Sequence, residues 1–150
     1  MRVGIIGAGS MGAGIAQVAA TAGCDVKIFD QSENACQKAL EKLGKILTRL
    51  IEKGRINQSE KESILYKINI VSDLDMFSDA DLVIEAIIEN ENIKKQLFSQ
   101  LSKLVSKQCI IATNTSSLSV TNLASVCDHP ERFIGIHFFN PAPLMPLVEI

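Results

Sequence analysis

Short apolar runs alternate with amphipathic segments along the whole chain, and this alternation restricts the fold more than any other feature. The runs are rich in β-branched residues, and the longer segments between them repeat their apolar positions with a helical period. We expect strands at residues 2–6, 25–30, 68–71, 81–86, 109–113 and 133–138, and helices at residues 10–21, 33–53, 58–66, 91–105 and 120–126. Nearly apolar strands that alternate with helices indicate a parallel sheet covered on both faces. The sequence therefore predicts a doubly wound, mostly parallel α/β fold, with residues 1–150 forming a single domain.

Composition excludes several classes of protein. The 150 residues are 47% hydrophobic and 21% charged with a net charge of −2, so the chain can form a core but lacks the cationic excess that coats nucleic acid or membranes. No apolar run approaches the roughly 18 residues of a membrane span, and the N-terminus lacks the features of a signal peptide. The cysteines, Cys24, Cys36, Cys109 and Cys127, form no CxxC pair and have no metal-ligand spacing. We therefore expect a cytoplasmic protein with reduced thiols, no metal, and no nucleic-acid or membrane partner.

A glycine-rich loop joins the first predicted strand to the first predicted helix. It has the pattern GxGxxG and consists of Gly7, Ala8, Gly9, Ser10, Met11 and Gly12. The first glycine of such a loop allows a tight turn, the second lets the backbone approach a pyrophosphate, and the third lets helix and strand pack closely. The helix that follows points free N–H groups at the phosphates. The alternative is a tight turn that binds nothing, but a strand before the loop and a helix after it favour dinucleotide binding.

An acidic residue at the end of the second predicted strand indicates which dinucleotide is bound. Asp30 lies 18 residues after Gly12, where a carboxylate can accept hydrogen bonds from both hydroxyls of an adenosine ribose. The same carboxylate would repel a 2′-phosphate, and the neighbours Gln31 and Ser32 supply no arginine to attract one. The sequence therefore predicts an NAD-binding domain of the Rossmann type, with Asp30 and Gln31 beside the ribose.

Polar residues follow the later predicted strands, at the edge of the sheet where open α/β folds bind their ligands. Ser116 follows the fifth predicted strand, and His137 closes the sixth. A histidine can remove a hydroxyl proton near neutral pH while hydride leaves the same carbon, and Glu149 is a candidate partner for its second ring nitrogen. Ser116 can bond the substrate oxygen and hold it in line with the base. Spacing alone leaves open a structural alternative, in which His137 is an ordinary polar residue and the segment around Ser116 caps a helix.

Together the motifs resemble the 3-hydroxyacyl-CoA dehydrogenase family, which includes the bacterial 3-hydroxybutyryl-CoA dehydrogenases. The matching segments lie in the family's order over nearly the whole chain, and they are IGAGSMGAGIAQ (6–17), DLVIEAIIEN (81–90), IKKQLF (93–98), ATNTSSLS (112–119) and GIHFFNPAPLMPLVEI (135–150). The HFFNP segment is far more specific to the family than the glycine loop. The resemblance implies oxidation of (S)-3-hydroxyacyl-CoA, in particular 3-hydroxybutyryl-CoA, to 3-oxoacyl-CoA by NAD, or the reverse reaction.

The resemblance also implies roles for individual residues. His137 is similar to the family's catalytic base, Glu149 to the carboxylate paired with it, and Ser116 to the serine that binds the substrate oxygen. Asp30 corresponds to the residue that holds the ribose. The residues that resemble the remaining lining of the cofactor site are Ala86, Glu89, Lys94, Asn114 and Asn140.

The family has a second, all-helical domain, which carries a catalytic asparagine, covers the acyl chain and forms the dimer. From the resemblance we expect such a domain after residue 150 of the intact enzyme, and a homodimer formed through it. The apolar segment at residues 141–150 is the surface that we expect to face it. We also expect the 150 residues alone to bind NAD with little turnover.

A stripe of cations runs along the long helix predicted at residues 33–53. It consists of Lys38, Lys42, Lys45, Arg49 and Lys53, which fall within about 80° of one another on a helical surface. One interpretation is a solvated cationic face, and the other is a contact for the phosphates of coenzyme A. The family is similar in placing a helical lysine near the coenzyme A phosphate, so Lys53 is the first candidate for binding the acyl-CoA substrate and Arg49 the second.

Two other functions fit part of the sequence. A 3-hydroxyacid dehydrogenase that resembles 6-phosphogluconate dehydrogenase also begins with GxGxMG, but it would use a lysine from a helical domain and would not need His137. A non-catalytic NAD-binding module would need only the glycine loop and its acid. The sequence as a whole favours an NAD-dependent 3-hydroxyacyl-CoA dehydrogenase.

Overall fold

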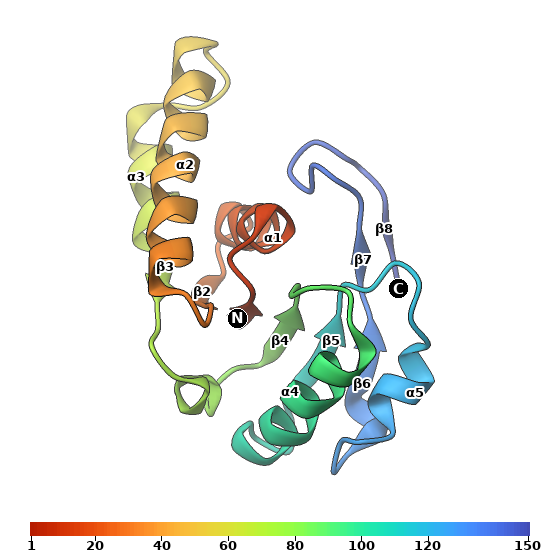
Figure 1. Cartoon of the computed structure of the whole chain (residues 1–150). Helices are drawn as coiled ribbons and strands as arrows, with labels where there is room; N and C mark the ends of the chain where they lie inside the picture. Colours follow the sequence, from red (N-terminus) through yellow and green to blue (C-terminus); the bar gives the residue numbers. More distant parts are fainter.

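The computed structural model describes all 150 residues and has a six-stranded parallel sheet at its centre (Figure 1). The strands of this sheet are β1 (Arg2–Ile6), β2 (Asp25–Phe29), β3 (Ile68–Ile70), β4 (Leu82–Glu85), β5 (Ile110–Thr113) and β6 (Phe133–Gly135). Their order is β3-β2-β1-β4-β5-β6, and every neighbouring pair is parallel. This is the strand order of a doubly wound dinucleotide-binding fold, so the predicted fold class is confirmed.

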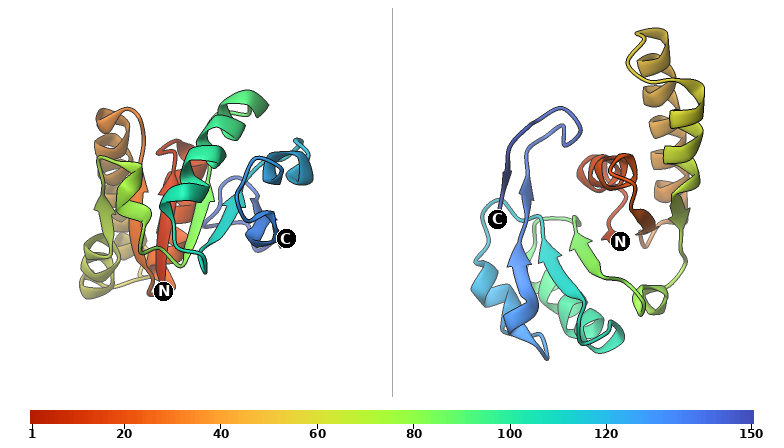
Figure 2. Two further views of the ribbon diagram at one scale, coloured as in Figure 1. Left: turned by 90° about the horizontal axis from the view of Figure 1, so that it is seen from below. Right: turned by 180° about the vertical axis from the view of Figure 1, so that it is seen from behind.

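The connections between the strands contain the helices. They are α1 (Ser10–Thr21), α2 (Glu33–Glu52), α3 (Gln58–Tyr66), α4 (Glu91–Leu104) and α5 (Val120–Ala124), with short 3₁₀ helices η1 (Leu74–Phe77) and η2 (Pro130–Arg132). Figure 2 shows α2 and α3 at one end of the molecule and α4 and α5 at the other. The predicted helices agree with these bounds to within two residues, whereas η1 and η2 are too short to leave a periodic signal in the sequence.

The sheet divides the core into two clusters. α1 and α2 contribute Ile15 and Leu47 to the cluster on one face, and η1 and α4 contribute Phe77 and Phe98 to the cluster on the other. Each of these side chains is at most 1% exposed, and burying one of this size stabilises the fold by about 1.5–3 kcal/mol. Both faces of the sheet are therefore covered, as the apolar strands predict.

The sixth predicted strand, residues 133–138, is wrong in its second half. β6 ends at Gly135, and His137 and Phe138 form a separate strand, β7 (His137–Phe138), which pairs antiparallel with β8 (Val148–Glu149). The chain leaves the sheet because the backbone N–H of Phe138 donates to the side-chain Oδ1 of Asn114, at 2.8 Å, and not to a carbonyl of β5. An apolar run does not reveal which of its N–H groups is taken by a side chain.

Membrane-spanning helices, thiols and metal-binding clusters can be judged directly from the structure. None of the helices is both long and apolar enough to cross a membrane. The four cysteines are free thiols, and burial raises the pKa of Cys109 and of Cys127 to about 11. No group of three or more His, Cys, Asp or Glu side chains is placed to hold a metal ion.

Candidate active site

The candidate site lies where the direction of strand order reverses, between β1 and β4. Strands β1, β4 and β5 are neighbours and parallel, so the loops that follow them meet at one edge of the sheet. These loops contain the glycine motif, residues 86–90 and residues 114–119. Open α/β sheets bind their ligands at such a switch point.

The glycine loop has the backbone geometry of a phosphate cradle. Gly7 has φ +106°, and a Cβ there would lie 2.5 Å from the carbonyl oxygen of Ala86. A Cβ on Gly12 would lie 1.8 Å from the carbonyl oxygen of Gly7, whereas a Cβ on Gly9 would meet nothing within 4 Å. Gly9 is also the N-cap of α1, and no side chain caps that helix end. The first and third glycines are therefore needed for packing, and the second leaves open space beside a free helix N-terminus, which suits a pyrophosphate.

Asp30 follows β2 and faces the glycine loop. Its Oδ2 accepts a hydrogen bond from the backbone N–H of Ala8 at 2.8 Å, and its Oδ1 accepts one from the N–H of Ser32 at 2.9 Å. Each carboxylate oxygen keeps a second lone pair for a ribose hydroxyl. Gln31 is exposed directly beside it. The acceptor oxygens of Asp30 and the free N–H groups at the start of α1, without a neighbouring arginine in the sequence, therefore fit an NAD ribose and pyrophosphate.

A cavity of about 320 Å³ joins this loop to the ends of β4, β5 and β7. Its lining residues are Met11, Ala86, Ile87, Glu89, Asn114, Ser116, His137, Phe138, Phe139 and Asn140. A larger groove of about 610 Å³ runs along α4, but it contains none of the candidate catalytic, cofactor-binding or substrate-binding residues. The smaller cavity is therefore the candidate site.

The pair formed by His137 and Glu149 arises from the strand pairing. The two residues are directly opposite each other in the antiparallel pair of β7 and β8, and Nδ1 of His137 lies 2.8 Å from Oε2 of Glu149. Because an ionised carboxylate only accepts hydrogen bonds, Nδ1 carries the proton of the neutral ring and Nε2 is left as the acceptor. The imidazole is held further by the ring of Phe139, whose centroid is 4.7 Å away.

The loop that carries Ser116 is held by Glu89. The Oε1 atom of Glu89 accepts hydrogen bonds from the Ser116 N–H at 3.1 Å, from the Ser117 hydroxyl at 3.3 Å and from the hydroxyl of Thr115. The Thr115 oxygen in turn accepts from the N–H of Leu118 at 3.0 Å. Ser116 is exposed at the cavity, so its hydroxyl is presented by a loop that Glu89 and Thr115 hold in place.

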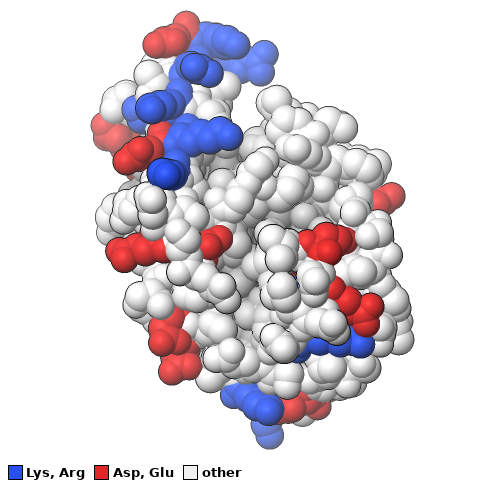
Figure 3. Space-filling model, in the orientation of Figure 1, with Lys and Arg blue, Asp and Glu red and all other residues white.

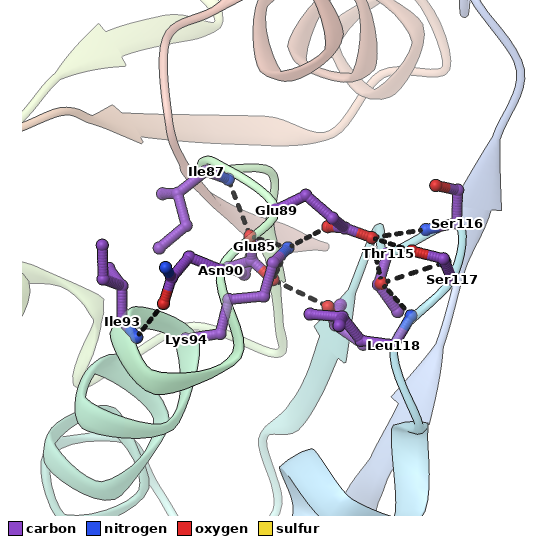
Figure 4. A network of polar contacts seen from close by, with 11 residues as sticks. Glu85, Ile87, Glu89, Asn90, Ile93, Lys94, Thr115, Ser116, Ser117 and Leu118 are labelled. Carbon is purple, nitrogen blue, oxygen red and sulfur yellow. Dashed lines mark hydrogen bonds and ion pairs between the residues drawn. The ribbon is translucent and has the colours of Figure 1, made fainter.

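Lys94 of α4 lies beneath Glu89, in a network drawn in Figure 4. Its Nζ is 2.7 and 2.9 Å from the two carboxylate oxygens of Glu85 and 3.0 Å from Oε2 of Glu89. The side chains of Lys94 and Glu85 are 1% and 0% exposed. Burial alone would raise the pKa of Glu89, but hydrogen bonds from Thr115 and Lys94, the charge of Lys94 and the Ser116 N–H lower it to about 2.

The structure brings most of the predicted residues together, with three exceptions. Lys94, predicted to line the cofactor site, is buried beneath Glu89 and does not line the cavity. Lys53 and Arg49 are exposed at the outer end of α2 and do not line the cavity. Figure 3 shows cations gathered over this end of α2, beside the notch that separates it from the link between β7 and β8. Glu85 is the residue that the sequence reasoning missed. A glutamate that ends an otherwise apolar buried strand was the available signal, because such a charge needs a buried partner.

Comparisons with known proteins agree with this geometry. The family model described as the NAD-binding domain of 3-hydroxyacyl-CoA dehydrogenase matches residues 2–150. A Deinococcus radiodurans protein named "Probable 3-hydroxybutyryl-CoA dehydrogenase" is 47% identical over 150 residues, which are 100% of this chain and 54% of that protein. The 3-hydroxybutyryl-CoA dehydrogenase of Clostridioides difficile is 43% identical over 150 residues, covering 100% of this chain and 53% of that protein.

A solved structure shows the same likeness. The crystal structure of 3-hydroxybutyryl-CoA dehydrogenase from Escherichia coli K12 superposes with a TM-score of 0.97 at 42% identity, over 99% of this chain and 31% of that one. The chain spans about half the length of the curated relatives described above. Since the family model covers nearly every residue, the chain belongs to the 3-hydroxyacyl-CoA dehydrogenase family and carries its NAD-binding domain.

Proposed function

We propose that this domain serves in the NAD-dependent oxidation of an (S)-3-hydroxyacyl-CoA, of the 3-hydroxybutyryl type, to the 3-oxoacyl-CoA, or in the reverse reaction. The observation that carries the proposal is the 2.8 Å contact between Nδ1 of His137 and Oε2 of Glu149. His137 and Ser116 line the same cavity, and Met11 of the glycine loop lines it too. A base, a hydroxyl donor and a dinucleotide cradle around one cavity are the requirements of an alcohol dehydrogenase.

In the oxidation, His137 acts as the general base. Nε2 accepts the proton of the substrate hydroxyl as the carbon–oxygen bond becomes a carbonyl, and Glu149 stabilises the imidazolium that forms. Ser116 donates a hydrogen bond to the substrate oxygen and keeps it in line with Nε2. Bound NAD would supply the acceptor for the hydride of the substrate carbon. In the reverse direction His137 returns the proton.

The remaining cofactor contacts follow from the cavity. Residues 7–12 and Asp30 would hold the pyrophosphate and the ribose, with the exposed Gln31 next to Asp30 in the chain. Ala86, Asn114 and Asn140 line the cavity beside His137, where the nicotinamide end has to lie for hydride transfer. Asn114 also accepts the Phe138 N–H at 2.8 Å, so it holds the strand that carries the base.

We assign the coenzyme A phosphates to Lys53 and Arg49. Both are exposed cations, Arg49 in the last turn of α2 and Lys53 as its C-cap, and phosphate groups favour such partners. Lys53→Met is expected to raise the KM for acetoacetyl-CoA and to weaken its salt dependence, whereas Lys38→Met, at the other end of the stripe, is the matched control and leaves both unchanged.

The relatives are about twice as long as this chain, and the resemblance places a catalytic asparagine, the cover of the acyl chain and the dimer contacts in their helical domain. We therefore expect the 150 residues alone to bind NADH with little turnover. The exposed apolar side chains of Leu144, Leu147 and Ile150, at 69%, 55% and 92% exposure, are the surface expected to meet such a domain.

The test combines two measurements. NADH is titrated into the 150-residue chain by fluorescence, and acetoacetyl-CoA reduction is assayed with this chain and with a protein of the relatives' full length, using free acetoacetate as the control substrate. We expect NADH binding by both proteins and reduction of the thioester by the longer one. Reduction of acetoacetate in preference to acetoacetyl-CoA would contradict the proposed substrate class, and absence of NADH binding would contradict the proposed site.

A further inference from the structure

We propose that Lys94 is a positioning residue, which acts through Glu89 to hold the loop that presents Ser116, and that it does so from a buried anchor on Glu85. This inference rests on the proposed function only in the role that it gives to Ser116. It also differs from the role that the family resemblance implies for Lys94, which is direct contact with the cofactor.

Lys94 is buried beneath the site. Its side chain is 1% exposed, and it does not line the candidate cavity. Its ammonium group lies within 3.0 Å of three carboxylate oxygens, two on Glu85 and one on Glu89. An ammonium group has three protons to donate, so these contacts occupy its full donor capacity.

Glu85 is the anchor of Lys94. The Glu85 side chain is 0% exposed. Besides Lys94 it has two partners, because its Oε2 accepts from the Thr113 hydroxyl of β5 at 2.7 Å and its Oε1 from the Ile87 N–H of the loop after β4 at 2.7 Å. The Lys94 ammonium is therefore held by Glu85 at the end of β4, which β5 and the backbone of the loop after β4 fix in turn. No buried side-chain polar atom lacks a partner, so the anchor is complete within the chain.

The Glu89 carboxylate connects the buried Lys94 to the exposed loop. Its Oε2 pairs with the Lys94 ammonium, and its Oε1 accepts hydrogen bonds from the Thr115 hydroxyl, the Ser116 N–H and the Ser117 hydroxyl. Figure 4 shows the Glu89 carboxylate between these two sets of partners. Lys94 is the charged group that acts on Glu89. Without it, Glu89 would sit above the buried carboxylate of Glu85 with no cation between them, and like charges at such range favour protonation of one of them.

The two neighbouring lysines of α4 have different environments. Lys94 points into the protein and orders a loop of the site, whereas its neighbour Lys95 is 26% exposed and pairs with Glu91 at 2.9 Å. A protonated Glu89 would lose acceptor capacity toward the Ser116 N–H, and the loop would be freer to open.

The experiment is nuclear magnetic resonance of the 150-residue chain, which needs neither cofactor nor substrate. The carboxyl resonance of Glu89 and the amide resonance of Ser116 are followed against pH, and amide hydrogen exchange is measured at Ser116. The variant Glu85→Gln with Lys94→Met removes both buried charges together, because removing the lysine alone leaves a bare buried carboxylate that threatens folding. Lys95→Met is the matched control.

In the double variant the titration midpoint of Glu89 is expected to rise by about one pH unit or more, and the Ser116 amide shift to follow with the same midpoint. Glu89→Gln provides a second test near the surface, in which exchange at Ser116 accelerates about tenfold because a charged acceptor is lost. Lys95→Met leaves both quantities unchanged. An unaltered Glu89 midpoint in the double variant, or unaltered Ser116 exchange in Glu89→Gln, overturns the proposal. Neither result bears on whether the family-length protein reduces acetoacetyl-CoA, so the two proposals fail separately.

Discussion

Two glycine substitutions in one loop separate folding from cofactor binding. In Gly12→Ala, the new Cβ would lie 1.8 Å from the Gly7 carbonyl oxygen, whereas ordinary contacts begin at 3.4 Å. Because the obstacle is backbone, α1 or the Gly7 turn must move by about 1.5 Å, which is expected to cost about 3 kcal/mol. For a domain of 150 residues this lowers Tm by about 6–12 °C.

Gly9→Ala is the matched substitution without that clash. A Cβ at Gly9 meets nothing within 4 Å, and the backbone there, at φ −67° and ψ −174°, is open to any L residue. We expect its free energy of unfolding to change by no more than about 1 kcal/mol, since the small loss at an N-cap is offset by the lower entropy of the unfolded chain. The methyl group instead occupies the space where the backbone meets the pyrophosphate, so NADH affinity falls at least about tenfold, or ~1.4 kcal/mol.

Thermal melting followed by circular dichroism and NADH titration followed by fluorescence measure the two effects on the same samples. The expected pattern is a stable Gly9→Ala protein that binds NADH poorly and a destabilised Gly12→Ala protein. If Gly9→Ala bound NADH with the affinity of the unmodified chain, the loop would not be the pyrophosphate cradle. If Gly12→Ala melted at the unmodified temperature, the packing argument would be wrong.

Three further predictions concern other parts of the molecule. His137→Ala in a protein of the relatives' length should lower turnover by about 10²–10⁴-fold, as loss of a general base does. His129→Ala changes a partly exposed histidine outside the cavity and is expected to leave turnover unchanged; steady-state rates test both. The pKa of Glu89 is lowered to about 2 in the folded chain from an ordinary 4.5. Its contribution to the free energy of unfolding is therefore present above about pH 4.5 and is lost as pH falls toward 2. Urea unfolding at several pH values should show this loss in the unmodified chain and a smaller loss in Glu89→Gln. Because burial raises the pKa of Cys109 and of Cys127 to about 11, both thiols should react with a thiol reagent only after unfolding, and mass spectrometry of the native chain should find them unlabelled.

Much of the fold could be predicted from the sequence because its signals are local. A β-branched run, a capping residue and a helical repeat each report on neighbours in the chain, and the predicted helices match the structure to within two residues. The one clear failure, the continuation of the sixth strand to residue 138, came from a contact between Asn114 and the Phe138 N–H. Those residues are 24 positions apart, and no periodicity records such a bond.

The candidate site divides in the same way. The glycine loop and Asp30 could be recognised because turn geometry and strand-end position are properties of short segments, and His137 and Ser116 stood out as polar residues at strand ends. Glu149 was a candidate partner for His137 from the sequence, and the antiparallel register of β7 and β8 places the two opposite each other. The burial of Lys94 against Glu85 and Glu89 could not be predicted from the sequence, because a lysine on an amphipathic helix normally faces solvent.

By itself, then, the sequence determined the class of fold, the identity of the dinucleotide cradle and the residue types available for proton transfer. Only the tertiary structure decided which of those residues meet, that β7 leaves the sheet to pair with β8, and that Lys94 is held under Glu89 by Glu85 and not at the surface of the site. The physical reason is that backbone preferences and apolar periodicity are set over a few residues, whereas the cost of burying a charge is met by partners that the fold brings from distant positions.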